Sequence, residues 1–268
     1  MINHFAIVAG GASGIGKSIS KRFADNGTSV MVVDIDNNSL EQTVKEINSS
    51  GGFAIGHNCN VTNWESAIAI MDPTLILKGK NCCLINCVGI RHPTGLLDES
   101  EETWNSAISI MLTSAFRLSQ QFIQVVKDNE SIGSICNIGS IVSQLVSDQS
   151  PAYHVAKSGL RGLTTYLSVA AGQNDANVRV NLIEPGLIIQ ERHQDLYGSD
   201  ANRKWRDMCQ EYQPLGVVGV EDDIVNAVFF LTDPRSSYIN GSILAVDGSA
   251  SNVEQFSIYS RLRHNQNS

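Results

Sequence analysis

Residues 5–16 read Phe-Ala-Ile-Val-Ala-Gly-Gly-Ala-Ser-Gly-Ile-Gly, a short apolar run that passes directly into a glycine-rich loop. The loop opens a stretch of helical periodicity that ends near Gly27, a residue typical of a helix stop. This order of strand, glycine turn and helix is typical of a phosphate site. Gly10 would allow the tight turn, Gly14 would let the backbone approach a pyrophosphate, and Gly16 would permit close packing of the helix. An ordinary loop can share the glycine pattern, so the interpretation depends on the residues that come next in the chain.

The next apolar run, 30–33, ends at Asp34. A dinucleotide site places a carboxylate on the adenosine ribose about 20 residues beyond its glycine loop. Asp34 would accept hydrogen bonds from the ribose hydroxyls and would repel a 2′-phosphate. The nearest basic residue, Lys17, follows the last glycine on the helix and is expected to face solvent. The sequence therefore predicts NAD(H) rather than NADP(H) as the cofactor.

Short runs rich in Val and Ile alternate with helical segments along the chain. Continuously apolar runs are typical of parallel strands covered by helices on both faces, and right-handed crossovers fix the direction of winding. The alternation predicts an α/β, Rossmann-type fold: a single domain with a doubly wound, seven-stranded parallel sheet flanked by helices. The expected strands are 5–9, 30–33, 53–55, 83–85, 135–138, 178–183 and 243–246, and the expected helices are 15–25, 40–48, 65–71, 101–126, 152–171 and 222–231.

We expect this nucleotide-binding domain to span residues 1–250. Within it, segment 189–219 is richer in polar and aromatic residues and has no strand signal, which predicts an insertion that serves as a substrate lid. Residues 251–268 are polar and are expected to form a C-terminal tail, either an oligomer arm or a frayed end.

Composition excludes several classes of function. The chain has 268 residues and a formal net charge of −8, which argues against a nucleic-acid partner. It contains neither a signal-peptide pattern nor an apolar run long enough to span a membrane, so we expect a soluble, cytoplasmic protein. The six cysteines have no metal-pair spacing and are interpreted as reduced structural thiols, with no metal site. Cys87 falls close to the expected binding site, and we interpret it as a small buried apolar residue.

Three residues form a candidate catalytic set. Pro151 suits the first turn of a helix, and the four-residue spacing of Tyr153 and Lys157 places them on one face of it. A phenol exchanges its proton near neutral pH only beside a positive charge that favours the phenolate, and Lys157 with an oxidised nicotinamide would supply that charge. Ser140, after the expected strand 135–138, would hydrogen-bond the substrate oxygen. Each residue alone is common, so the order of all three carries the prediction.

These features together resemble the short-chain dehydrogenase/reductase family. The resemblance rests on the Gly10 to Gly16 loop, Asn86-Cys87-Val88-Gly89, Ser140 with Tyr153 and Lys157, Asn181 with Pro185-Gly186, and the segment 237–248. It implies hydride transfer between NAD(H) and the carbinol or carbonyl carbon of a small alcohol or ketone. Tyr153 would be the general acid/base, Ser140 would orient the oxygen, and Lys157 would bind the nicotinamide ribose and favour the phenolate.

The resemblance also implies the remaining contacts. Substrate would meet Ser140, Tyr153, Gln144 and the loop that carries Arg91 and His92, and the protein would form a homotetramer through helices 101–126 and 152–171. The implied cofactor-binding residues are Gly10, Ser13, Gly14, Ile15, Gly16, Asp34, Ile35, Asn60, Val61, Asn86, Val88, Gly89, Tyr153, Lys157, Pro185, Gly186 and Ile188.

Two departures from the family pattern touch the chemistry. Met111 stands where the family usually has an Asn, whose helix kink holds a water that links Lys157 to solvent. Gln190 stands where a Thr usually bonds the nicotinamide carboxamide, a task that a Gln amide can also perform. We expect slower turnover rather than none.

Two alternatives stay open. One is a catalytically weak NAD(H)-binding redox sensor or scaffold of the same fold, which Met111 and Gln190 favour. The other is a sugar epimerase or dehydratase, which the short C-terminal third disfavours.

Overall fold

A seven-stranded parallel sheet forms the centre of the computed structural model, which describes residues 4–71, 80–90, 94–190, 207, 209, 211–254 and 257. The strand order is β3-β2-β1-β4-β5-β6-β9, and every neighbouring pair is parallel. The predicted fold class is therefore confirmed. The strands are β1 (Phe5–Ala9), β2 (Ser29–Asp34), β3 (Ala54–Asn58), β4 (Asn81–Asn86), β5 (Ile132–Ile138), β6 (Val178–Pro185) and β9 (Ile243–Val246).

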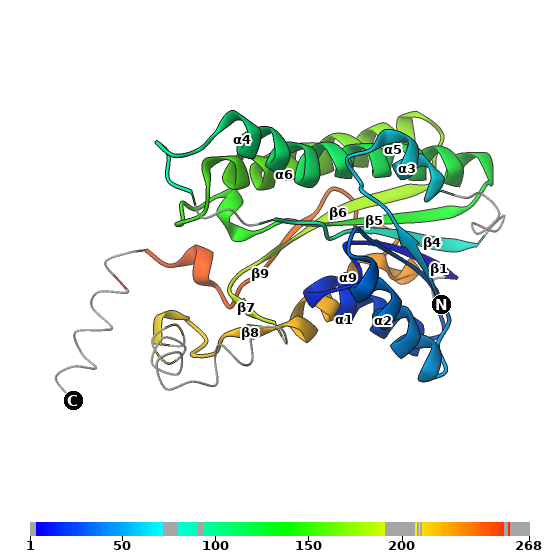
Figure 1. The fold of residues 1–268 in the computed structure, drawn as a ribbon, viewed down its shortest axis with the longest axis horizontal. Helices are drawn as coiled ribbons and strands as arrows, with labels where there is room; N and C mark the ends of the chain where they lie inside the picture. The colour runs from blue at the N-terminus through cyan, green and yellow to red at the C-terminus, as the bar shows by residue number, and fades with distance from the viewer. Residues whose placement is uncertain are drawn as a thin grey trace.

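Helices cover both faces of this sheet, as Figure 1 shows. One layer holds α3, α4, α5 and α6, and the opposite layer holds α1, α2 and α9. Among the described residues, no helix combines the length and the apolar character needed to cross a membrane. The helices are α1 (Gly14–Asp25), α2 (Asn37–Ser49), α3 (Trp64–Ala69), α4 (Glu101–Ile108), α5 (Ser114–Asp128), α6 (Pro151–Gln173) and α9 (Glu221–Thr232).

The sheet separates two apolar cores. Along β1, Phe5, Ile7 and Ala9 belong to the core under α5 and α6, whereas Ala6 and Val8 belong to the core over α1, α2 and α9. Both faces of the strand are buried, so the strand is apolar at every position. This is the physical reason for the uninterrupted apolar run at the start of the sequence.

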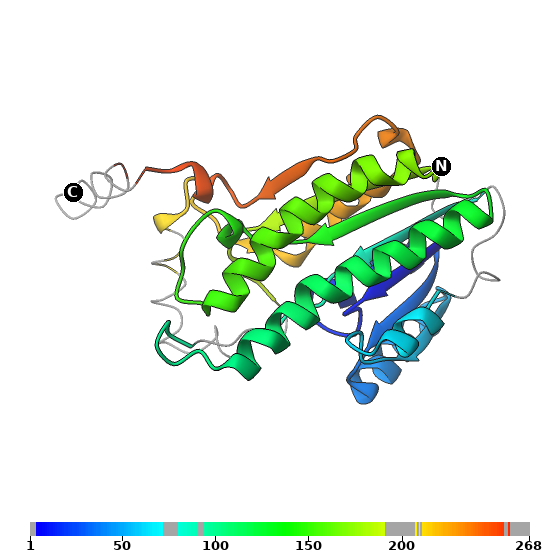
Figure 2. The ribbon, with the colours of Figure 1, turned by 90° about the horizontal axis from the view of Figure 1, so that it is seen from above.

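The strand order places a crevice in the middle of the sheet. The chain builds β1, β2 and β3 outward in one direction, then returns to pair β4 with β1 and continues the other way through β5 and β6. The strand arrows point to the same end in Figure 2. The turns that follow β1, β4 and β5 therefore meet at this end, where open α/β sheets bind their ligands.

Most element bounds differ from the expected ones by one to three residues, and two differences go further. The helix predicted over 101–126 is interrupted by a π-helical turn, η1 (Ser109–Thr113), which separates α4 from α5. Segment 189–219, expected to lack strands, contributes to a second small sheet in which β7 (Ile188–Ile189) pairs with β8 (Gly219–Val220). Strands of two residues depend on their partner for stability and leave no periodic signal in the sequence.

We predict that Gly16→Ala destabilises the protein by about 1–3 kcal/mol, the usual cost of overpacking. A Cβ at Gly16 would overlap the Gly10 carbonyl oxygen and approach its carbonyl carbon to 2.8 Å, so the start of α1 would be pushed off the β1 turn. The free energy of unfolding in urea measures the effect.

Gly172→Ala is the matched control, because a Cβ there meets nothing within 4 Å and Gly172 lies in α6. This change should raise the free energy of unfolding by up to about 1 kcal/mol. Equal effects of the two substitutions would contradict the packing argument.

Candidate active site

A cavity of about 460 Å³ opens at the carboxyl end of the central strands. It extends from Asp34, at the end of β2, to Tyr153 and Lys157 on α6. Most residues named from the sequence therefore surround one space. The predicted cofactor residues that line it are Gly10, Ser13, Ile15, Gly16, Asp34, Ile35, Asn60, Val61, Val88, Gly89, Tyr153, Lys157, Pro185, Gly186 and Ile188, and the predicted catalytic residue Ser140 lines it too.

The glycine turn forms one wall of the cavity. Gly10 has a φ of +76°, and a Cβ there would stand 3.0 Å from the backbone nitrogen of Val88. The first N–H groups of a helix lack intrahelical acceptors, and the Ser13 side chain does not cap α1. A bare backbone turn and an uncapped helix start are suited to holding a diphosphate.

Asp34 places a carboxylate at the β2 end of the cavity. Its Oδ2 accepts a hydrogen bond from the Ala12 N–H at 3.1 Å, and its Oδ1 accepts one from the Asp36 N–H at 3.2 Å. Lys17 does not face open solvent as expected, because its Nζ lies 2.9 Å from Glu46 Oε2. The proximity of α1 and α2 brings this acid within reach of Lys17.

Ser140, Tyr153 and Lys157 converge at the other end of the cavity. Ser140 follows β5 and is the N-cap of the 3-10 turn η2 (Ile141–Ser143). The helix α6 starts at Pro151, one residue before the expected range 152–171, with Pro151 in its first turn as predicted. Ser150 caps it by accepting a hydrogen bond from the Tyr153 N–H at 3.2 Å.

Lys157 is buried beneath the tyrosine ring. Its Nζ donates to the Ile138 carbonyl oxygen at 2.9 Å and lies 5.7 Å from the centroid of the Tyr153 ring. A phenol, a hydroxyl and an ammonium group thus line one pocket, which suits proton transfer to or from a substrate oxygen.

Cys87 lies in the same wall, where it lines the cavity. Burial raises the pKa of its thiol to about 11, although the positive charge of Lys157 acts in the opposite direction. The residue therefore stays a neutral thiol at physiological pH and is a poor nucleophile.

Three predicted site residues, and also Met111, do not line the cavity in the structure. Asn86 is buried in the core instead, where its Nδ2 donates to Asn137 Oδ1 at 2.8 Å and to Ser119 Oγ at 3.2 Å. Gln144 donates its amide to Glu184 Oε2 at 2.9 Å. Gly14 lies beside the cavity, where a Cβ would meet the Gln190 amide. Met111, on η1, packs into an apolar cluster with Ala152 and Ala156.

Gln190 lines the cavity. Arg91 and His92, the predicted substrate contacts, lie outside the described residues.

The sequence analysis missed Glu184, a fully buried acid at the end of β6. Its signal was present, because a carboxylate within the apolar strand 178–185 is costly unless it is paired. Its partners, Arg161 and Ser143, are distant in sequence and give no local pattern.

Comparisons with known proteins agree with this geometry. A family model described as enoyl-(acyl carrier protein) reductase matches residues 10–250. The chain is similar to the (2S)-[(R)-hydroxy(phenyl)methyl]succinyl-CoA dehydrogenase subunit BbsD of Thauera aromatica, with 31% identity over 93% of this chain and 97% of that protein. It is also similar to the 3-oxoacyl-[acyl-carrier-protein] reductase FabG of Thermotoga maritima, with 29% identity over 90% of this chain and 95% of that protein.

Among solved structures, a putative gluconate dehydrogenase from Agrobacterium tumefaciens superimposes with a TM-score of 0.83 and 26% identity, covering 94% of this chain and 98% of that one. The sequence, the fold and these comparisons lead to one conclusion. The chain belongs to the short-chain dehydrogenase/reductase family of oxidoreductases.

Proposed function

We propose that this protein transfers a hydride between NAD(H) and the carbinol or carbonyl carbon of a small alcohol or ketone. The observation that carries the proposal is the meeting of Ser140, Tyr153 and Lys157 in the same cavity as the glycine turn and Asp34. When bound, NAD(H) supplies the hydride donor or acceptor at nicotinamide C4.

The residues of the cavity fit this cofactor. The N–H groups that start α1 would bind the diphosphate, and Asp34 would accept hydrogen bonds from the adenosine ribose hydroxyls. Asn60 and Val61 would lie along the adenine, and Ile188 would pack beside the carboxamide.

The chemical step belongs to the other end of the cavity. Ser140 would donate a hydrogen bond to the substrate oxygen and hold it against the Tyr153 hydroxyl. Tyr153 would give up its proton in reduction or take one in oxidation, and the Lys157 ammonium beneath it would stabilise the phenolate. Lys157 would also bind the nicotinamide ribose.

Charge in the adenosine end favours NAD(H) over NADP(H). A 2′-phosphate would face the Asp34 carboxylate, and Lys17 is already paired with Glu46. Among the described residues that line the cavity, Lys157 is the sole cation, and it lies at the catalytic end.

Met111 favours a second candidate function, a redox sensor or scaffold that binds NAD(H) without efficient turnover. Its buried, apolar side chain packs in the cluster that also contacts Tyr153, where the family usually has the polar residue of a proton relay. The catalytic set itself supports an enzyme.

We further propose that the protein forms a homotetramer and is located in the cytoplasm. Apolar side chains stand exposed on α6, including Tyr166 at 68% and Val169 at 57%, and burial against a second copy would remove them from water. The six cysteines are free thiols, as suits a reducing compartment.

The role of Tyr153 as the acid/base can be tested by substitution. Tyr153→Phe should lower kcat at least about 100-fold, because proton transfer by a positioned group contributes on that scale. Cys87→Ala, in the same cavity wall, should leave kcat within about threefold because its thiol stays neutral.

Absorbance at the nicotinamide band measures both variants. The substrate panel consists of secondary alcohols, sugar alcohols, hydroxy acids and 3-hydroxyacyl thioesters, since two of the similar proteins are named for thioester substrates. NADH binding without turnover of any substrate in wild type would favour the sensor.

The second prediction concerns the cofactor. Wild type should have a Kd for NADH at least about tenfold below that for NADPH, and Asp34→Ala should narrow the ratio by relieving repulsion of the 2′-phosphate. Quenching of protein fluorescence measures both constants. An unchanged ratio in Asp34→Ala would exclude Asp34 as the selecting residue.

The third prediction concerns Met111. Met111→Asn should raise kcat, because an amide in η1 would supply the polar group that a relay to Lys157 needs. Met111→Leu, an apolar replacement of similar volume, is the control and should leave kcat unchanged. An equal kcat in wild type and Met111→Asn would mean that proton relay through this position does not limit the rate.

A further inference from the structure

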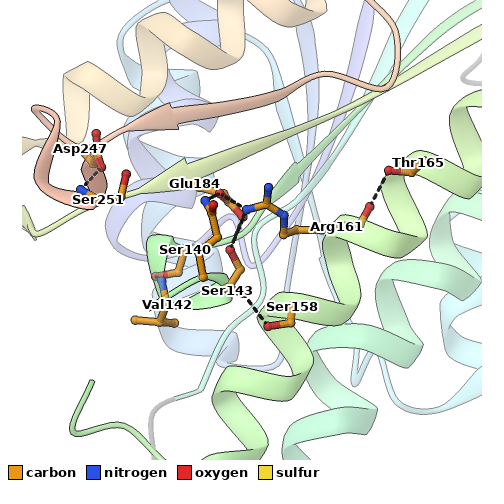
Figure 3. A network of polar contacts seen from close by, with 10 residues as sticks. Ser140, Val142, Ser143, Ser158, Arg161, Thr165, Glu184, Asp247 and Ser251 are labelled. Carbon is orange, nitrogen blue, oxygen red and sulfur yellow. Dashed lines mark hydrogen bonds and ion pairs between the residues drawn. The ribbon is translucent and has the colours of Figure 1, made fainter. Parts of the chain in front are cut away.

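Glu184 is a charged residue without solvent exposure, on β6 beside the turn that follows Ser140. Both of its oxygens have partners from other elements, as Figure 3 shows. Arg161 Nη1 lies 2.9 Å from Oε2 and 3.1 Å from Oε1, Gln144 donates to Oε2 at 2.9 Å, and Ser143 Oγ donates to Oε1. One carboxylate on β6 thus holds side chains from α6, from η2 and from the residue after η2.

The contacts of Glu184 fix one end of the turn that begins at Ser140. Ser140 is the N-cap of η2, and its Oγ accepts a hydrogen bond from the Val142 N–H at 3.4 Å. Ser143, the last residue of η2, is held by Glu184 and by Ser158, whose Oγ donates to the Ser143 carbonyl oxygen at 2.9 Å. The Ser143 N–H also donates to the Ser140 carbonyl oxygen at 3.0 Å, so the two ends of the turn are directly linked.

Stability alone does not explain an acid buried at this place. The Glu184 side chain is fully buried, whereas that of Arg161 is 30% exposed. Desolvation of the carboxylate offsets much of its attraction to Arg161, so an apolar residue of similar volume commonly stabilises a fold as well or better. An apolar residue cannot direct a hydroxyl and an amide, however. The two carboxylate oxygens orient Ser143 and Gln144 from one side, while Arg161 balances the charge from the other.

We propose that Glu184 is a positioning residue for the reaction. It holds η2 in the orientation that presents the Ser140 hydroxyl to the substrate oxygen, with Arg161 as its counter-ion. The inference rests on the proposed function, because it assigns Glu184 to the hydride-transfer site. It also gives Gln144 a different task from the predicted one, an anchor of the turn rather than a substrate contact.

Glu184→Gln tests the proposal, because it keeps the length of the side chain and removes the charge that accepts from three donors. Ser143→Ala is a second, milder variant that removes one of the three donors to the carboxylate. Ile47→Ala is the control for stability loss, since it empties a buried site on α2, outside the catalytic end of the cavity.

Three measurements on the full chain separate positioning from folding. Turnover on the panel gives kcat and KM, fluorescence gives the Kd for NADH, and hydrogen–deuterium exchange reports the amides of residues 141–145 and, as a reference, 132–138. The exchange measurement needs no substrate, so it decides whether Glu184 holds the turn even if the proposed activity fails.

We expect kcat to fall about 10- to 100-fold in Glu184→Gln and less in Ser143→Ala, because misplacing a reacting group by about 1 Å costs on this scale. The Kd for NADH should stay within about twofold. Amides 141–145 should exchange at least about tenfold faster while 132–138 are unchanged. Ile47→Ala should lower the melting temperature without either effect.

Unchanged exchange at 141–145 in Glu184→Gln would overturn the anchoring role. Faster amide exchange with an unchanged kcat in Glu184→Gln would overturn the role of Glu184 in positioning Ser140 for the reaction. A loss of kcat in Ile47→Ala equal to that in Glu184→Gln would overturn it too. Failure of wild type to turn over any panel substrate would instead reject the proposed function.

Discussion

The parallel pairing of β1 with β4 is the interaction on which the site depends. Ala9 is in register with Asn86, and the Cys87 N–H donates to the Ala9 carbonyl oxygen at 3.0 Å. The turns that follow β1 and β4 therefore leave the sheet side by side. Gly10 comes so close to Val88 that a side chain at Gly10 has no room. This contact builds one wall of the cavity from backbone, which allows a ligand to approach the start of α1 closely.

A second set of interactions sets the position of α6 relative to the glycine turn. Asn86 on β4 donates to Asn137 on β5, and Asn137 donates to Thr164 on α6 at 2.9 Å. Hydrogen bonds have direction, which apolar packing lacks, so this buried chain constrains how α6 lies along the sheet. Tyr153 and Lys157 then reach the cavity at the level of Ser140. Asn86 therefore helps to fix the position of α6 from within the core and does not line the cavity.

Sequence alone predicted the features that are local in the chain. β1 and β9 match their expected bounds, because each is an apolar run with a clear end, and α6 begins at Pro151 after a capping serine. Features that depend on partners distant in sequence were not predictable in this way. Lys17 on α1 pairs with Glu46 on α2, and the Asn86 side chain hydrogen-bonds within the core. Glu184 accepts hydrogen bonds from Arg161 and Ser143. The π-helical turn at 109–113 was not predicted either, because one extra residue in a single turn hardly alters the apolar periodicity of the helix.

The distribution of charge along the cavity gives it a direction. Asp34 ends β2 and Ser140 follows β5, with β1 and β4 between them, so three interstrand steps separate the two by roughly 14 Å. The negative group at one end suits the hydroxyls of an adenosine ribose, and the Lys157 cation at the other suits a phenolate and a second ribose. Between them, Cys87 stays neutral because burial raises its pKa to about 11. The two ends of the cavity therefore differ in charge, and a long ligand whose ends match them would enter in one orientation.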